Sequence, residues 1–270
     1  MDSGKLPEFF YEIFDASLPR LGAGNEAATI RALTMLRAAP PRRAKKAVPR
    51  TTRILDLGCG NGGQTVTLAR HTEGSILAMD NHQPYLDELQ RRAEAAGVSG
   101  RIQVSLRDMR SLGKEDGPFD LIWSEGALFV IGFRKGLTAC HSLLAPGGEL
   151  AVSELCWLRP DRPADCQRYF AAVYADRAGT DASQGLVDIE SNLATIRACG
   201  YEVLGHFTLP EAAWWEPFYH PLEERLRSLR TQYPAEAEKL ALIESIQAEI
   251  DLYRQYSAFY GNVFFVMRRR

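Results

Sequence analysis

The stretch RILDLGCGNGGQTVTLAR occupies residues 53–70 and decides the fold of the chain around it. Its first five residues are mostly apolar and predict a buried strand, while residues 63–71 have the pattern of a helix. Between them, glycines at positions 58, 60 and 63 have the G-x-G-x-x-G spacing of turns that bring a ligand close to the backbone. The stretch therefore predicts a strand, a tight turn and a helix, with a ligand site at the turn.

Strands and helices continue to alternate as far as residue 155, which predicts an α/β fold. Such alternation implies a Rossmann-like, doubly wound sheet of parallel strands with helices on both faces. The predicted strands cover residues 53–57, 75–80, 101–106, 119–124 and 149–155, and the predicted helices between them cover residues 63–71, 83–97 and 133–144.

The composition fits one large domain and excludes several classes of protein. The 270 residues are 46% hydrophobic and 10% aromatic, and the net charge of −2 gives no reason to expect a polyanionic partner. No apolar run approaches the roughly 20 residues of a membrane helix, and no basic-then-apolar leader begins the chain, so we expect a cytoplasmic protein that does not enter a membrane. Five cysteines without a C-x-x-C pair predict neither a disulfide framework nor a metal site.

Three acidic residues follow the first three predicted strands. Asp56 lies at the end of the first strand, just before the glycine turn, where its charge would repel a pyrophosphate and attract an ammonium group, directly or through water. Asp80 ends the second strand, where a carboxylate can accept hydrogen bonds from both hydroxyls of a ribose. Asp108 and its neighbour Met109 suit an adenine held by its amino group against an apolar wall. Because the carboxyl ends of parallel strands meet at one edge of a sheet, these residues predict a phosphate-free nucleoside site there.

Five motifs in order carry a family resemblance. They are ILDLGCGNGG, the acid at Asp80, RDM at 107–109, FDLIWSEGAL at 119–128 and LLAPGGELAV at 143–152. The chain resembles the class I S-adenosylmethionine-dependent methyltransferases of the small-molecule type, and a bacterial subgroup of unknown substrate in particular. The resemblance implies a seven-stranded sheet of order 3-2-1-4-5-7-6 with the last strand antiparallel. It also implies S-adenosyl-L-methionine as cofactor, S-adenosyl-L-homocysteine as product, and a small-molecule acceptor.

The same resemblance predicts one methyltransferase domain over residues 1–270. Residues 1–50 form an N-terminal helical lead-in that acts as a lid, with Asn25 as a helix cap. Residues 51–158 form the cofactor-binding core. Residues 159–270 form a C-terminal half with a helical cap inserted at about 211–257, which also offers a surface for a homodimer.

The cofactor site implied by the resemblance is a ring of residues around the glycine turn. The turn lines the methionine and ribose, Asn81 lies near the adenine, Ser124 lies close to the sulfonium, and Arg20 pairs with the carboxylate of the cofactor. The expected cofactor-binding residues are Asp56, Gly58, Cys59, Gly60, Gln64, Asp80, Asn81, Asp108, Met109, Ser124 and Arg20.

Candidates for catalysis and acceptor binding follow from their places after the later strands. Glu125 comes directly after the fourth strand and is expected both as a catalytic residue and as an acceptor contact. His220 is a candidate base, and Tyr11 lies in the lid. The acceptor pocket is expected to be walled by Glu154 and Trp157, which flank the end of the fifth strand, and by Trp215 and Tyr219. Cys59 has two interpretations: a nucleophile whose pKa the helix N-terminus lowers, or a residue that offers only its backbone.

Two other functions stay open at this point. A methyltransferase acting on RNA is favoured weakly by the basic run at 42–53 and by the terminal RRR. A nicotinamide-dependent oxidoreductase is favoured by the glycine spacing, but no Tyr-x-x-x-Lys pair occurs in the sequence.

Overall fold

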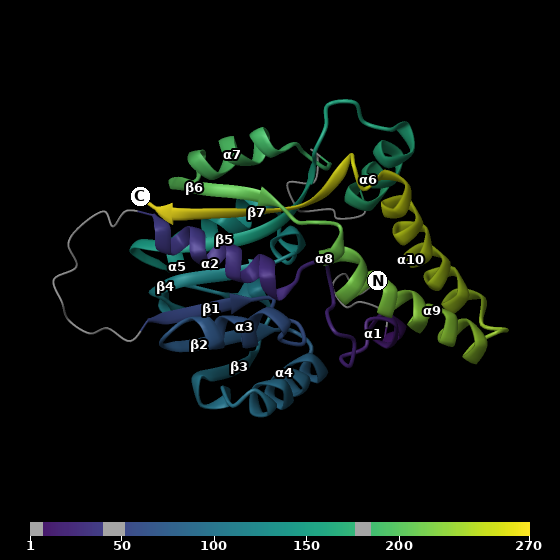
Figure 1. Ribbon diagram of the computed structural model, residues 1–270, viewed down its shortest axis with the longest axis horizontal. Helices are drawn as coiled ribbons and strands as arrows, with labels where there is room; N and C mark the ends of the chain where they lie inside the picture. The colour runs from purple at the N-terminus through teal and green to yellow at the C-terminus, as the bar shows by residue number, and fades with distance from the viewer. Residues whose placement is uncertain (1–7, 40–51, 176–184) are drawn as a thin grey trace.

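A computed structural model describes residues 8–39, 52–175 and 185–270 (Figure 1). The basic connection predicted over 40–53 lies almost entirely outside these ranges.

The core is a seven-stranded sheet of order β3-β2-β1-β4-β5-β7-β6, as the resemblance predicted. β1 to β5 pair in parallel, while β7 runs antiparallel to both β5 and β6. The strands are β1 (Arg53–Leu57), β2 (Ser75–Asp80), β3 (Ile102–Leu106), β4 (Phe119–Glu125), β5 (Leu144–Trp157), β6 (Tyr201–Thr208) and β7 (Tyr260–Arg269).

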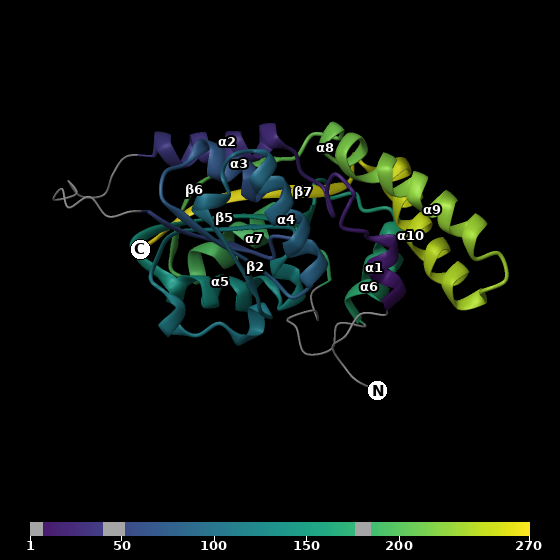
Figure 2. The ribbon, with the colours of Figure 1, turned by 90° about the horizontal axis from the view of Figure 1, so that it is seen from below.

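Helices cover both faces of the sheet, as the alternating pattern predicted. Figure 2 shows α2 and α3 above the sheet and α5 and α7 below it, and α4 packs beside α3. Leu33 and Leu68 belong to the core of the first face, and Leu137 and Ile196 to the core of the second. These helices are α2 (Glu26–Ala38), α3 (Gly63–His71), α4 (Gln83–Ala95), α5 (Phe133–Leu143) and α7 (Ile189–Ala198).

Local sequence signals set several element boundaries. Asn25 caps α2 by accepting a hydrogen bond from the backbone N–H of Ala28 at 2.9 Å, as predicted. Pro84 lies in the first turn of α4, where its missing N–H costs nothing. The largest boundary error concerns β5, which begins at Leu144 and not at the predicted position 149, because Leu144 already pairs with Phe119 ahead of a register shift in β4.

The remaining helices gather beyond the carboxyl ends of the parallel strands, at the right of Figure 1. The lid helix is held to the cap there, because Arg225 donates to the carbonyl of Glu12 at 3.0 Å and the Tyr233 hydroxyl donates to the Glu12 carboxylate at 2.7 Å. These helices are α1 (Glu8–Ile13), α6 (Ala164–Ala175), α8 (Ala212–Trp214), a π-helical segment (Trp215–Tyr219), α9 (His220–Gln232) and α10 (Ala237–Tyr256). Over the described ranges, no helix is both long enough and apolar enough to cross a membrane.

Gly62, at the N-terminus of α3, provides a test of the packing of α3 against α4. Its φ is +85°, and an added Cβ would lie 2.1 Å from Cδ1 of Leu89. Gly97 also has a positive φ, of +69°, but an added Cβ would meet nothing within 4 Å. Both alanine variants incur about 1–2 kcal/mol of backbone strain. Only Gly62→Ala also displaces Leu89, which we expect to cost about 1–3 kcal/mol more. Urea unfolding of the two variants measures the difference; equal losses would contradict this packing.

Candidate active site

A cavity of about 490 Å³ opens at the carboxyl ends of β1, β2, β4 and β5, beneath the lid and the cap. One half is lined by the glycine turn and by the residues that follow β2 and β3. The lining residues of this half include Gly58, Cys59, Gly60, Gln64, Asp80, Asn81, Asp108 and Met109. The other half is lined by the lid and the C-terminal half of the chain, including Phe10, Phe14, Glu154, Tyr169, Phe170, Trp214, Tyr219, Glu249 and Tyr260.

The glycine turn presents bare backbone to the cavity. The N–H groups of Gly58 and Cys59 both donate to the carbonyl of Met79 at 2.9 Å, which fixes the turn against β2. Gly58 has φ +72°, and a Cβ on it would lie 2.4 Å from Cβ of Ala127. A side chain is therefore excluded there, and a ligand can approach the turn closely.

Asp80 links the turn to the end of β2. Its carboxylate accepts hydrogen bonds from the backbone N–H of Gly60 at 2.9 Å and of His82 at 3.1 Å. Burial raises the pKa of this carboxyl, although the hydrogen bonds oppose the shift. The carboxylate is thus held in one orientation at the cavity wall, where acceptor lone pairs can serve a ligand hydroxyl.

Asp108 and Met109 line the same half of the cavity. The Asp108 carboxylate accepts a hydrogen bond from the N–H of Arg110 at 2.8 Å and pairs with its guanidinium at 3.1 Å. Met109 Cε lies 3.6 Å from the Cβ position of Gly58, so an apolar side chain lies beside the turn. The predicted polar residue and apolar wall therefore occur side by side at this edge.

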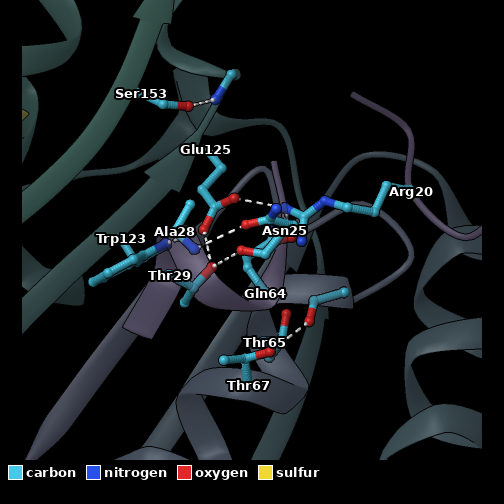
Figure 3. A network of polar contacts seen from close by, with 12 residues as sticks. Arg20, Asn25, Ala28, Thr29, Gln64, Thr65, Thr67, Trp123, Glu125 and Ser153 are labelled. Carbon is cyan, nitrogen blue, oxygen red and sulfur yellow. Dashed lines mark hydrogen bonds and ion pairs between the residues drawn. The ribbon is translucent and has the colours of Figure 1, made fainter. Parts of the chain in front are cut away.

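Glu125 is the centre of a polar network (Figure 3). Its carboxylate accepts hydrogen bonds from Arg20 at 2.5 Å, from the Thr29 hydroxyl at 2.8 Å and from the indole N–H of Trp123 at 2.9 Å. The side chains of Arg20 and Glu125 are 10% and 3% exposed, so the ion pair is almost fully desolvated. Since three donors already occupy the carboxylate, the geometry assigns Glu125 the role of anchoring the lid segment to β4. Glu125 lines the cavity, but this anchoring does not favour the catalytic role expected from the sequence.

Asp56 is not where the sequence reasoning expected it. Its side chain is fully buried and does not line the cavity; it accepts hydrogen bonds from Thr65 at 2.6 Å and Gln64 at 3.4 Å. Burial raises the pKa of Asp56 from 3.8 to about 7, with the nearby charge of Glu125 acting in the same direction. The expected direct attraction of a ligand ammonium is therefore wrong, because strand pairing turns this carboxyl under the turn and onto α3.

Two predicted cofactor contacts, Ser124 and Cys59, have surroundings that differ from those expected. Ser124 is fully buried, outside the cavity lining, and its hydroxyl donates to the carbonyl of Leu57 at 2.9 Å. It therefore links β4 to β1. Cys59 lines the cavity, but burial and the charges of Asp56 and Asp80 raise its pKa well above the usual value. The expected lowering by the helix N-terminus was wrong, and a thiolate nucleophile is not favoured.

Two predicted catalytic residues lie outside the cavity lining. His220 is exposed in the first turn of α9, with its ring 5.4 Å from that of Trp215. Tyr11 stacks on His82 at 3.8 Å with an interplanar angle of 8°. Both residues lie near the predicted edge of the sheet. The helical phase of α9 turns the His220 side chain outward, and stacking on His82 holds Tyr11 against α4.

The structure brings three of the five predicted residues of the acceptor pocket to the cavity, namely Glu125, Glu154 and Tyr219. Trp157 is buried in the core, edge-on to Phe170 at 5.6 Å. Trp215 lies outside the cavity lining, and the guanidinium of Arg254 lies 5.0 Å from the centre of its ring. The π-helical segment changes the helical phase between Trp215 and Tyr219, which the sequence pattern did not reveal.

Sequence reasoning missed several residues that line the acceptor half. Tyr169 and Phe170 come from α6, Glu249 from α10 and Tyr260 from the start of β7. No motif marks them, because their common position depends on how distant helices fold over the sheet.

The buried carboxyl of Asp56 predicts a pH dependence of stability. Because its pKa is raised from 3.8 to about 7 on folding, the neutral form is favoured in the folded protein. The contribution of the neutral Asp56 carboxyl to the free energy of unfolding is therefore fully present below about pH 4. It is lost as pH rises through about 7, by up to about 4 kcal/mol. Asp56→Asn should flatten this dependence. Urea unfolding at pH 4, 5.5 and 8 measures it, with exposed Asp87→Asn as the control; parallel curves for wild type and Asp56→Asn would contradict it.

The Arg20–Glu125 ion pair predicts that substitutions of the two residues have strongly non-additive effects on the free energy of unfolding. Glu125→Gln leaves a buried guanidinium without its counter-charge, which we expect to lower the free energy of unfolding by about 3 kcal/mol. Arg20→Met together with Glu125→Gln should cost less than the sum of the two single changes. Chemical unfolding of the four proteins at pH 7 measures the coupling. Strict additivity would mean that the two side chains do not interact.

The comparisons with known proteins agree with this geometry. Residues 54–148 match the family described as a methyltransferase domain. The chain is 26% identical over 190 residues to the sterol 24-C-methyltransferase erg-4 of Neurospora crassa, covering 70% of this chain and 49% of the relative. It is 27% identical over 208 residues to the 27-O-demethylrifamycin SV methyltransferase of Amycolatopsis mediterranei, covering 75% and 70%. The chain spans about half the length of the sterol methyltransferases that it matches.

Two solved structures share the fold over nearly their whole length. The S-adenosylmethionine-dependent methyltransferase of Geobacter sulfurreducens, solved with S-adenosyl-L-homocysteine, has a TM-score of 0.77 at 20% identity and covers 98% of this chain and 99% of its own. The corresponding protein of Thiobacillus denitrificans has a TM-score of 0.74 at 22% identity and covers 99% and 100%. With the strand order and the motifs, these findings confirm the resemblance seen in the sequence: residues 54–148 match a methyltransferase domain, and the chain has the fold of these S-adenosylmethionine-dependent methyltransferases.

Proposed function

We propose that this protein transfers a methyl group from S-adenosyl-L-methionine to a small-molecule acceptor. The observation that carries the proposal is one cavity with two chemically different halves: a glycine turn with fixed carboxylates, and an aromatic chamber beneath the cap. A nucleoside cofactor and a second, organic molecule can meet where these halves join.

The residues of the first half fit this cofactor. Gly58 presents backbone that no side chain could cover, Asp80 offers oriented carboxylate oxygens to a ribose, and Asp108 with Met109 offers the adenine a polar and an apolar contact. Arg20 lines the cavity and can pair with the carboxylate of the cofactor. The other proposed contacts are Cys59, Gly60, Gln64 and Asn81.

The cofactor supplies a methyl group on a positively charged sulfur, so the protein has mainly to align the acceptor with this methyl group and to shield the two reactants from water. Alignment of two reactants in a fixed site can contribute roughly 7–11 kcal/mol. The lid supplies the shielding: Phe10 and Phe14 line the cavity, and the Arg20–Glu125 pair holds the lid segment to the sheet. An acceptor that must lose a proton also needs a nearby base, and Glu154 and Glu249 are the carboxylates of the acceptor half.

We further propose a cytoplasmic protein that does not act on nucleic acid and whose cap helices provide a homodimer surface. The net charge of −2 supports the proposal against nucleic acid. The basic run that favoured RNA weakly lies largely outside the described residues, and a small enclosed cavity suits a small acceptor better than a polymer.

Isothermal titration tests the proposed function directly. We expect binding of S-adenosyl-L-methionine and S-adenosyl-L-homocysteine at micromolar concentrations and none of NAD(P)H. Binding of a nicotinamide dinucleotide without S-adenosyl-L-methionine would reverse the proposal, and strongly salt-dependent binding to tRNA would favour an RNA substrate.

Asp80 should contribute much of the cofactor affinity. Asp80→Ala removes an oriented carboxylate that can accept charge-assisted hydrogen bonds, each worth about 1.5–3 kcal/mol. We therefore expect the affinity for S-adenosyl-L-homocysteine to fall by about 10- to 100-fold in titration calorimetry. Asp87→Asn, an exposed change on neighbouring α4, should leave it unchanged. An unchanged affinity in folded Asp80→Ala would place the ribose elsewhere.

A further inference from the structure

The lid segment between α1 and α2 is held in place by side chains of other elements. Residues 14–25 form turns and bends, so their backbone is not fixed by a helix or a sheet. Arg92, on α4, donates from its two terminal nitrogens to three carbonyls of this segment: to Leu18 at 2.7 Å, to Pro19 at 2.9 Å and to Ala16 at 3.4 Å. Because backbone carbonyls are strong acceptors, these hydrogen bonds tie the segment to α4.

Asn61, in the glycine turn, binds two of the same carbonyls. Its side-chain nitrogen donates to the carbonyl of Leu18 at 2.6 Å and to that of Ala16 at 3.1 Å. The Leu18 carbonyl therefore accepts one hydrogen bond from Asn61 and one from Arg92, which uses both of its lone pairs. The lid segment is thus joined to the glycine turn and to α4 at a single point.

Glu88 orients the guanidinium of Arg92. The Nε of Arg92 donates to the Glu88 carboxylate at 2.7 Å, one helical turn away, which leaves Nη1 and Nη2 for the lid segment. Hydrogen bonds from Arg91 and Arg92 lower the pKa of Glu88 to about 2, so this carboxylate is charged at neutral pH. The side chain of Arg92 is only 19% exposed, and it lies outside the lining of the cavity. Its contacts therefore serve the lid and not a ligand in the cavity.

The carbonyl of Pro19 belongs to the peptide group that leads into Arg20. Arg20 lines the cavity, and its guanidinium is already paired with Glu125 at 2.5 Å (Figure 3). A guanidinium has five N–H donors in a rigid, planar arrangement, so the others can serve a ligand only if the backbone places the whole group correctly. The hydrogen bond from Arg92 to Pro19 therefore bears directly on the direction of the Arg20 side chain.

We infer that Arg92 is a positioning residue for cofactor binding, which acts from outside the cavity by fixing the lid segment so that Arg20 meets the carboxylate of the cofactor. The inference rests on the proposed function, in which Arg20 pairs with that carboxylate. Without Arg92, a smaller fraction of the molecules holds Arg20 in place, and the apparent affinity for a ligand that needs Arg20 falls by the same fraction. A ligand without the carboxylate gains nothing from Arg20 and should not show this loss.

The test compares two ligands that differ in their amino-acid portion. S-adenosyl-L-homocysteine carries the carboxylate, whereas 5′-methylthioadenosine keeps the nucleoside and the thioether but lacks the carboxylate. We expect Arg92→Met to reduce the preference for S-adenosyl-L-homocysteine over 5′-methylthioadenosine by about tenfold in titration calorimetry, which corresponds to the loss of about one charge-assisted hydrogen bond. An unchanged preference would overturn the inference. An equal loss of affinity for both ligands would also overturn it, because it would mean a general weakening of the lid or the fold.

Arg91→Met is the matched control. Arg91 precedes Arg92 on the same helix, its side chain is 67% exposed, and its hydrogen bonds within the described part of the chain go to the same carboxylate, that of Glu88. We expect Arg91→Met to leave the preference unchanged. A loss equal to that of Arg92→Met would assign the effect to Glu88 or to the charge of α4 and would contradict the inference. Arg92→Lys keeps the charge and some of the donors, so it should retain more of the preference than Arg92→Met.

A combined variant tests whether Arg92 acts through Arg20. Arg20→Met is made together with Glu125→Gln, so that no buried charge is left without its partner. This pair of changes should remove most of the preference, because it removes the proposed partner of the carboxylate. Adding Arg92→Met should then reduce the preference no further, since two changes on one route are not additive. A further loss of about tenfold would show that Arg92 acts by another route and would overturn the inference.

The same titrations separate this inference from the proposed function. A wild-type protein that binds no S-adenosyl-L-homocysteine fails the proposed function itself. A protein that binds it, but whose preference does not depend on Arg92, retains the proposed methyl transfer and loses only the positioning role. Equal affinity of the wild type for the two ligands would place the carboxylate away from Arg20, and it would overturn the inference in the same way.

Discussion

Parallel pairing of β1 with β2 and β4 is the constraint on which the site depends. Because all three strands run in the same direction, the glycine turn, Asp80 and Glu125 open onto one edge of the sheet. The hydrogen bonds from the turn to Met79 and Asp80 then join the first two strand ends into one rigid wall. Every later part of the site is placed against this wall.

The site depends next on the attachment of the N-terminal lid segment to the end of β4. Glu125 accepts hydrogen bonds from Arg20 and from Thr29, which lie on either side of the cap residue Asn25. One buried carboxylate thereby ties both the loop before α2 and the helix itself to the end of β4 (Figure 3). The next residue, Gly126, donates to the Ser153 hydroxyl at 2.9 Å, so β5 joins the same assembly. A buried ion pair is costly to desolvate, so its value here lies in fixing one arrangement of lid and sheet.

The carboxylates at this edge illustrate how burial assigns different roles to the same functional group. Asp56 is completely enclosed and its pKa rises to about 7, so it serves the packing of α3. Asp80 reaches the cavity and is oriented by backbone N–H groups. Glu249 is oriented by tyrosine hydroxyls inside an aromatic wall. All three are acidic residues, yet one is enclosed by packing, one faces the cavity from a set of backbone N–H groups, and one is held by tyrosine hydroxyls.

The amino-acid sequence by itself determined the sheet, the position of the glycine turn and the residues that line the cavity on the side of that turn. These features depend on local periodicity and on residues near strand ends, such as Asp80 and Asp108, whose placement follows once parallel strands are recognised. Only the tertiary structure decided that Asp56 is buried, that Glu125 is an anchor, and that the π-helical segment turns Tyr219 rather than Trp215 into the cavity. The acceptor chamber depends on contacts among helices far apart in the chain, and no local pattern encodes where such helices meet.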